Sequence, residues 1–150
     1  MKNVYFETIT VVEKLHRLFL DVIKVELDRM QLHDINNVQC FILYNVGQSE
    51  MTVGELSNRG YYLGSNVSYN LKKLVENKYF IQEQAKHDKR ASKIRLSEKG
   101  LKLYNKIDAI FDKQADNLRH NGIAEKNLSE TIKVLRKLES YLSFMIIHNS

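Results

Sequence analysis

The chain of 150 residues is 43% hydrophobic and 27% charged, which suits a folded domain and argues against wholesale disorder. No apolar run approaches the roughly 20 residues that a membrane helix needs, so we expect no membrane association. Glu7 and Glu13 interrupt the N-terminal stretch, which is unlike a signal peptide. The single cysteine, Cys40, excludes an internal disulfide framework. We therefore expect a cytoplasmic protein in a reducing compartment.

The positive charge is concentrated in the middle of the chain. Residues 1–60 carry six Lys and Arg against eight Asp and Glu, residues 61–100 carry nine against four, and residues 101–150 carry eight against six. The central segment thus has a net charge of +5, which equals that of the whole chain. Such a segment is typical of a surface that binds a polyanion. Charge alone does not separate DNA from RNA, an acidic protein, a membrane surface or a merely solvated face.

The first predicted elements are two helices. A long helix covers about residues 1–30, where apolar residues form two adjoining rows. Two rows make a stripe wider than a surface helix needs, which predicts two packing partners. Asp34 is expected to cap a second helix, which ends at Gly47.

A helix-turn-helix is predicted next. Thr52 and Glu55 have the spacing of a capping box, which predicts a short helix over residues 53–58. After a glycine-bracketed turn, a helix over residues 65–77 has one apolar side and an opposite side that is polar, aromatic and basic. In such a unit the second helix lies in the major groove of duplex DNA. The candidates for base edges are Ser65, Asn66, Ser68 and Tyr69, and those for phosphate contacts are Lys72 and Lys73.

A basic β-hairpin follows the helix-turn-helix. Strand-like runs at residues 79–82 and 92–96 flank a polar, cationic tip at residues 86–90. A hairpin in this position makes the unit winged, and its tip can reach phosphates or the minor groove. The candidate contacts are Asp88, Lys89, Arg90 and Lys93, with Asp88 expected to pair with Arg90 and fix the tip.

Two long helices complete the predicted order. Ser97 caps one over about residues 98–119, Asn121 and Gly122 end it, and the last helix covers about residues 124–147. Exposing the apolar row of the last helix in a monomer would leave a large patch, so we expect it to form a homodimer interface. That row consists of Leu128, Ile132, Leu135, Leu138, Leu142 and Met145.

The run from His87 to Gly100 resembles the wing signature of the MarR family of regulators. That signature is Asp-x-Arg, an alternating strand, and Leu-Thr/Ser-x-Lys-Gly, all of which are present at the family's spacing. Residues 52–56 and 67–76 resemble the family's helix-turn-helix. The chain departs from the family at the end of the recognition helix, where the usual Gly is replaced by Asn77-Lys78-Tyr79-Phe80. We expect Asn77 to tolerate the left-handed cap conformation there.

The resemblance implies a mainly α fold with a small β-hairpin wing, in which a winged helix-turn-helix is flanked by long dimerisation helices. We expect one MarR-like domain over residues 1–150. Its DNA-binding lobe is residues 34–97, and its dimerisation helices are residues 1–33 and 98–150.

The expected function is sequence-specific binding of double-stranded DNA in transcription regulation, by a homodimer on a palindromic operator. The resemblance also implies a small-molecule effector, of unidentified chemistry, bound between the dimer helices and the DNA-binding lobe. One alternative is a winged-helix protein–protein adaptor. Another is redox sensing through Cys40, although its neighbours bring no charge to stabilise a thiolate. We find no catalytic motif and no paired histidine spacing, so we expect no enzyme activity, cofactor or metal.

Overall fold

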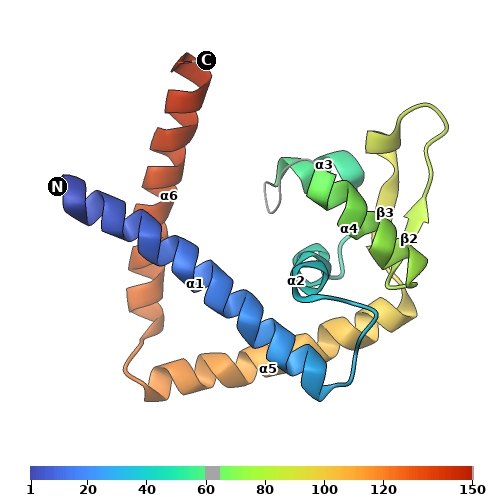
Figure 1. Ribbon diagram of the computed structural model, residues 1–150, viewed down its shortest axis with the longest axis horizontal. Helices are drawn as coiled ribbons and strands as arrows, with labels where there is room; N and C mark the ends of the chain where they lie inside the picture. The colour runs from blue at the N-terminus through green and yellow to red at the C-terminus, as the bar shows by residue number, and fades with distance from the viewer. Residues whose placement is uncertain (60–64, 150) are drawn as a thin grey trace. The chain divides into compact units, whose positions relative to one another are not determined.

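The computed structural model describes residues 1–59 and 65–149 (Figure 1). By internal contacts the chain divides into two compact units, Met1–Ile107 and Asp108–Ser150. The expected fold class is confirmed: helices dominate, and the described strands form one small antiparallel sheet. In chain order the elements are α1 (Lys2–Arg29), α2 (Asn37–Val46), β1 (Met51–Thr52), α3 (Val53–Asn58), α4 (Ser65–Glu76), β2 (Phe80–Glu83), the 3-10 turn η1 (Lys89–Ala91), β3 (Lys93–Leu96), α5 (Glu98–His120) and α6 (Glu125–Asn149).

The core of the first unit lies where α2 and α4 meet the sheet and the first turns of α5. Each element contributes one apolar side, because its buried residues recur at helical or strand spacing. The Tyr44 and Tyr104 rings stack at a centroid distance of 5.0 Å and hold α2 against α5. The buried apolar residues of these elements and of α3 include Ile42, Leu43, Val46, Leu56, Val67, Leu71, Leu74, Phe80, Ile94, Leu103 and Ile107.

One partner of α1 is α2. The Phe41 ring meets those of His16 and Phe19 edge-on, and Asn37 Nδ2 donates to the Leu20 carbonyl at 3.1 Å. Within α1 only Ile23 and Leu27 are buried. Most of the two predicted apolar rows is exposed in the single chain, namely Tyr5, Ile9, Val11, Val12, Leu15, Leu18, Val22 and Val25.

The cap of α2 is Asn36, so the prediction of Asp34 was wrong. The Asn36 side chain accepts from the Gln39 backbone N–H at 2.8 Å, and Gln39 Oε1 accepts from the Asn36 N–H at 3.1 Å. Asp34 lies two residues before the cap position, and its carboxylate is bound to distant partners, as described below. The predicted end of the helix at Gly47 is confirmed, with φ +58°. The Thr52–Glu55 capping box of α3 is confirmed as well.

The wing contains a third strand that the sequence analysis missed. The strand order is β1-β3-β2, with Met51 opposite Ile94 on one side of β3 and Phe80 opposite Leu96 on the other. β1 has only two residues, too few for an alternating pattern to reveal it. Because α3 begins directly after β1, this strand ties the wing to the helix-turn-helix.

The end of α4 is a Schellman motif with Lys78, not Asn77, in the left-handed conformation. Lys78 has φ +65°, its N–H donates to the Val75 carbonyl at 3.0 Å, and the Tyr79 N–H donates to the Leu74 carbonyl at 2.9 Å. This bond pattern puts the positive φ at the second residue after the helix. The left-handed residue is therefore an exposed lysine, and the expectation that Asn77 adopts this conformation was wrong.

Replacing Lys78 with glycine should stabilise the fold by about 1 kcal/mol, because glycine has no Cβ to strain the left-handed backbone. The measurement is equilibrium unfolding in urea. Asn77→Gly is the matched control: it should bring a loss instead, since the Asn77 amide donates to the Asp34 carbonyl at 2.9 Å. A gain for Asn77→Gly and none for Lys78→Gly would contradict this assignment.

Candidate nucleic-acid interface

The outer side of α4 is polar, as the helical spacing predicts. Val67, Leu71 and Leu74 are buried, whereas Asn66, Ser68, Tyr69 and Lys72 are exposed. Tyr69 is 58% exposed and presents an aromatic ring that can meet a base edge or sugar. Ser65 is the first residue of α4, but its side chain lies outside the described part.

The two lysines of α4 are held next to an acidic side chain. Lys73 Nζ lies 3.4 Å from a Glu76 carboxylate oxygen and 5.8 Å from the centroid of the Tyr69 ring. Lys72 Nζ lies 4.0 Å from the same carboxylate group. These are exposed pairs, which contribute little to stability and can open when a phosphate competes.

Asn70 is a residue of α4 that the sequence analysis did not single out. It is buried, and its Oδ1 accepts from Gln39 Nε2 of α2 at 3.2 Å. A buried amide needs such a partner, because leaving it unpaired costs about 1–3 kcal/mol. The signal was its spacing, since Asn70 follows Val67 by three residues on the buried side. This pair fixes how α4 is seated on α2.

The cationic side chains of the wing turn and the strand after it have different partners. Asp88 accepts from the backbone N–H of Arg90 at 2.9 Å, so the expected pairing is with the backbone and not with the guanidinium. The guanidinium instead donates from Nη2 to Asn58 Oδ1 at 3.3 Å. Lys89 is exposed in the same turn, and Lys93 Nζ lies 3.8 Å from a Glu50 carboxylate oxygen. The turn η1 packs against α3, which brings Arg90 to the helix-turn-helix (Figure 1).

A polar clamp, formed by Asp34, Asn77, Tyr79 and Lys99, lies at the base of the wing. The Asp34 carboxylate accepts from the Tyr79 hydroxyl and from Lys99 Nζ, both at 2.6 Å. Lys99 Nζ also donates to the Asn77 carbonyl at 2.8 Å. Burial would raise the pKa of Asp34, but the bonds from Lys99 and Tyr79 outweigh it and hold that pKa below its usual value. Burial and Asp34 together raise the pKa of Tyr79 well above its usual value.

The Leu-Ser-x-Lys-Gly part of the wing signature thus has a structural role. Ser97 caps α5, since its Oγ accepts from the Gly100 N–H at 3.0 Å, while its hydroxyl donates to the Lys78 carbonyl. Lys99 belongs to the clamp. Gly100 leaves room for the Tyr79 carbonyl, which a Cβ would meet at 2.2 Å. These residues join the end of α4, the wing and α5.

The comparisons with known proteins agree with this geometry. Residues 35–100 match the winged helix DNA-binding domain family. The exopolysaccharide II synthesis transcriptional activator ExpG of Rhizobium meliloti (strain 1021) is 36% identical over 135 residues, which are 90% of this chain and 70% of that protein. The chain belongs to the MarR family of winged-helix transcriptional regulators. It is thus a DNA-binding regulator of transcription, and the adaptor alternative is not supported.

Two solved structures share the fold of this MarR regulator. Staphylococcus aureus MarR in complex with salicylate and kanamycin is 24% identical with a TM-score of 0.73, over 93% of this chain and 92% of that one. The S. aureus MepR–DNA complex is 23% identical with a TM-score of 0.67, over 95% of this chain and 98% of that one. At these identities the likeness concerns the fold.

The redox alternative through Cys40 finds no support in its surroundings. The side chain is fully buried, and burial raises the pKa of the thiol to about 12. Such a thiol is protonated at neutral pH, whereas a reactive cysteine needs thiolate and access. Cys40 is a packing residue of this MarR regulator.

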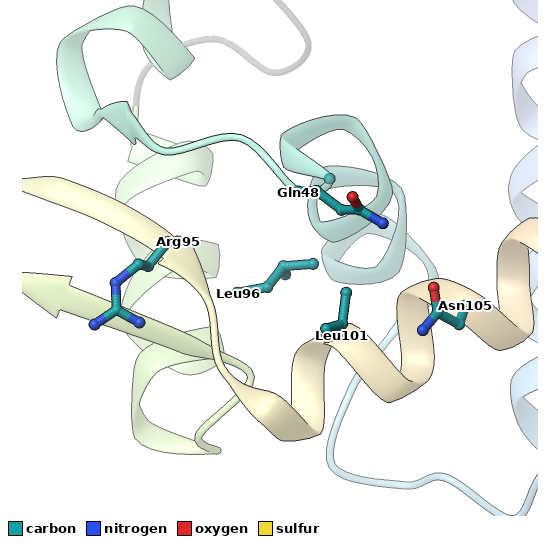
Figure 2. A pocket seen from close by; sticks show the side chains of 6 residues that line it. Gln48, Arg95, Leu96, Leu101 and Asn105 are labelled. Carbon is teal, nitrogen blue, oxygen red and sulfur yellow. The ribbon is translucent and has the colours of Figure 1, made fainter.

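A pocket of about 280 Å³ opens in the first unit between the end of α2, β3 and α5. Its lining includes Gln48, Arg95, Leu96, Leu101 and Asn105 (Figure 2). The Leu96 and Leu101 side chains lie next to one another, with Gln48 and Asn105 on the side away from Arg95, which extends away from them. The pocket thus combines an apolar floor with amide groups and a cation at its edge. Such a lining suits a small amphipathic molecule.

The apolar row of α6 is largely uncovered in the single chain. Leu128, Ile132 and Met145 are exposed, and Leu135, Leu138 and Leu142 are half-buried. A second set of exposed apolar residues on the same helix was not predicted from the sequence; these are Val134, Tyr141, Phe144, Ile146 and Ile147. Among the described residues, none of the helices has the length and apolar character to cross a membrane.

Proposed function

We propose that this regulator binds a palindromic duplex as a homodimer, with α4 in the major groove and the wing turn at the adjacent minor groove. Residues 34–97 would form the DNA-binding lobe, and residues 1–33 and 98–150 the dimerisation part. The observation that carries the proposal is the polar outer side of α4 beside a basic turn docked on α3. In this proposal Asn66, Ser68 and Tyr69 would contact base edges, because their side chains are exposed on the outer side of α4.

The base-reading and phosphate-binding residues should respond differently to truncation. Tyr69→Ala or Ser65→Ala should act mainly on the preferred site, since base-edge contacts distinguish sequences by about 1–3 kcal/mol each. Lys73→Ala should weaken binding to all duplexes alike and make the salt slope shallower by about one. The measurement is the affinity for a specific and a scrambled duplex at several salt concentrations.

Glu76→Gln is a useful companion variant. It removes the carboxylate next to both lysines, so it should strengthen binding to either duplex slightly and steepen the salt slope. If Tyr69→Ala and Ser65→Ala lowered both affinities equally, α4 would not read bases through these residues. Specificity would then come from elsewhere, such as DNA shape.

Dimerisation is supported by the exposed apolar residues of α1 and α6. Each of the two helices leaves a series of large apolar side chains exposed to water, which is unusual for a monomer. A second copy of the chain is the simplest cover, since a twofold dimer would also match the two half-sites of a palindrome.

Regulation by a small molecule is supported by the pocket between α2, β3 and α5. We expect a small amphipathic molecule to enter it, with Leu96 and Leu101 as the apolar floor and the amides of Gln48 and Asn105 as hydrogen-bonding groups. Salicylate, which S. aureus MarR binds, is a suitable probe: at millimolar concentration it should weaken DNA binding. Leu101→Trp fills the pocket and should remove the response while leaving DNA affinity without salicylate unchanged. An equal response in this variant would place the effector site elsewhere.

A further inference from the structure

The wing turn is fastened to α3 at its base. The Val53 N–H, at the start of α3, donates to the Ser92 carbonyl at 2.9 Å. Ser92 is fully buried, and its Oγ accepts from the Ala85 N–H at 3.2 Å across the wing. Because Arg90 is only two residues before Ser92, these bonds limit where its backbone can lie relative to α3.

Arg90 continues from this anchor across the surface of α3. A Cβ on Gly54 would lie 3.3 Å from the Arg90 carbonyl oxygen, 3.4 Å from its Nε and 3.5 Å from its Cβ. Because Gly54 has no side chain, Arg90 can pack directly against α3 at this position. One turn further along α3, the Asn58 amide oxygen accepts from the guanidinium at 3.3 Å. The side chain is held at two points, one steric and one polar.

The charge of the group that holds Arg90 is what distinguishes this cation. Lys73 and Lys93 of the same interface lie beside the carboxylates of Glu76 and Glu50, which offset part of their attraction for phosphate. Asn58 is neutral, so it orients the guanidinium and leaves its full charge available. Ordering a free arginine on DNA costs rotamer entropy, up to about 2 kcal/mol, and a side chain held beforehand avoids part of this cost.

We propose that Asn58 is a positioning residue of the DNA interface: it holds the Arg90 side chain against Gly54 of α3, so that this arginine is already oriented when the protein binds DNA. The proposal rests on the proposed function, because it requires that Arg90 contact the duplex. Asn58 itself need not touch DNA. Its effect on DNA binding passes through Arg90 alone, so it should disappear when Arg90 is removed.

The test is a double-mutant cycle on the full-length chain with Asn58→Ala, Arg90→Ala and Lys89→Ala. Affinity is measured by fluorescence anisotropy on a palindromic duplex selected in vitro, at several salt concentrations. Asn58→Ala should weaken binding about three- to tenfold, the range of a typical net hydrogen bond, with an unchanged salt slope. Arg90→Ala should weaken binding and make the slope shallower by about one.

The backgrounds give the decisive comparison. Asn58→Ala should cost nothing further in the Arg90→Ala background, but should keep its full effect in the Lys89→Ala background, since Lys89 is a cation of the same turn. An equal loss in both backgrounds, or no loss in the wild-type background, overturns the positioning role. Tighter binding by Asn58→Ala also overturns it, because Asn58 would then restrain Arg90 away from DNA. Unchanged affinity of Arg90→Ala would instead refute the proposed wing contact.

Discussion

Replacing Gly100 with alanine should destabilise the protein by about 2–3 kcal/mol, the upper part of the range for overpacking a buried site. A Cβ there would lie 2.2 Å from the Tyr79 carbonyl oxygen and 3.1 Å from Leu96 Cδ2. The carbonyl cannot easily withdraw, because it accepts from the Ser97 N–H at 2.9 Å. The helix α5 and the wing base would have to separate. Urea denaturation of the purified protein measures the effect.

The sign of the change at Gly100 is informative. In an unobstructed helix, replacing glycine with alanine stabilises by about 1 kcal/mol, so a gain in stability would contradict the close approach to Tyr79. Glu98→Ala is the matched control in the same first turn of α5, where the side chain is exposed. It should change stability by at most about 0.5 kcal/mol.

Leu135→Asp and Leu142→Asp should each raise the dimer dissociation constant by about a hundredfold or more and weaken DNA binding in parallel. Each replaces an apolar side chain worth about 1.5–3 kcal/mol on burial, at two symmetric positions, with a carboxylate that is costly to bury. Both leucines are only half-buried in the protomer, so the substitutions should leave the fold of one chain intact. Sedimentation velocity and DNA binding measured on the same samples test this.

Lys133→Asp supplies the control for the added charge. Lys133 lies about 200° around the helix from Leu135, and its side chain is exposed. The same carboxylate on that side should leave the dimer largely intact. A wild-type chain that sediments as a monomer at micromolar concentration would refute the dimer outright.

The sequence by itself determined the features that depend on neighbouring residues. The Thr52–Glu55 capping box, the glycine stop of α2 and the serine cap of α5 are local hydrogen-bonding patterns, and each was confirmed. The outward side of α4 followed from helical rotation alone, because a helix places its side chains at a fixed angular spacing. The wing signature then identified the family, since its residues and their spacing are carried by one continuous segment.

The tertiary structure alone decided which partner each polar group takes. Aspartate is a common helix cap, but the Asp34 carboxylate binds Tyr79 and Lys99, which are 45 and 65 residues away. The helix is capped by Asn36 instead. At the end of α4, asparagine tolerates a positive φ better than lysine does. The Schellman hydrogen bonds nevertheless place Lys78, and not Asn77, at positive φ.

The same holds for the wing. Two-residue β1 exists because β3 offers it a pairing edge, and Arg90 turns from Asp88 to Asn58, which lies 32 residues earlier in the chain. Gly100 is required by a carbonyl of a residue outside its own helix. A polar side chain has several partners of similar strength along the sequence, and folding selects among them through long-range packing. Local pattern therefore predicts the elements, and their mutual contacts decide the site.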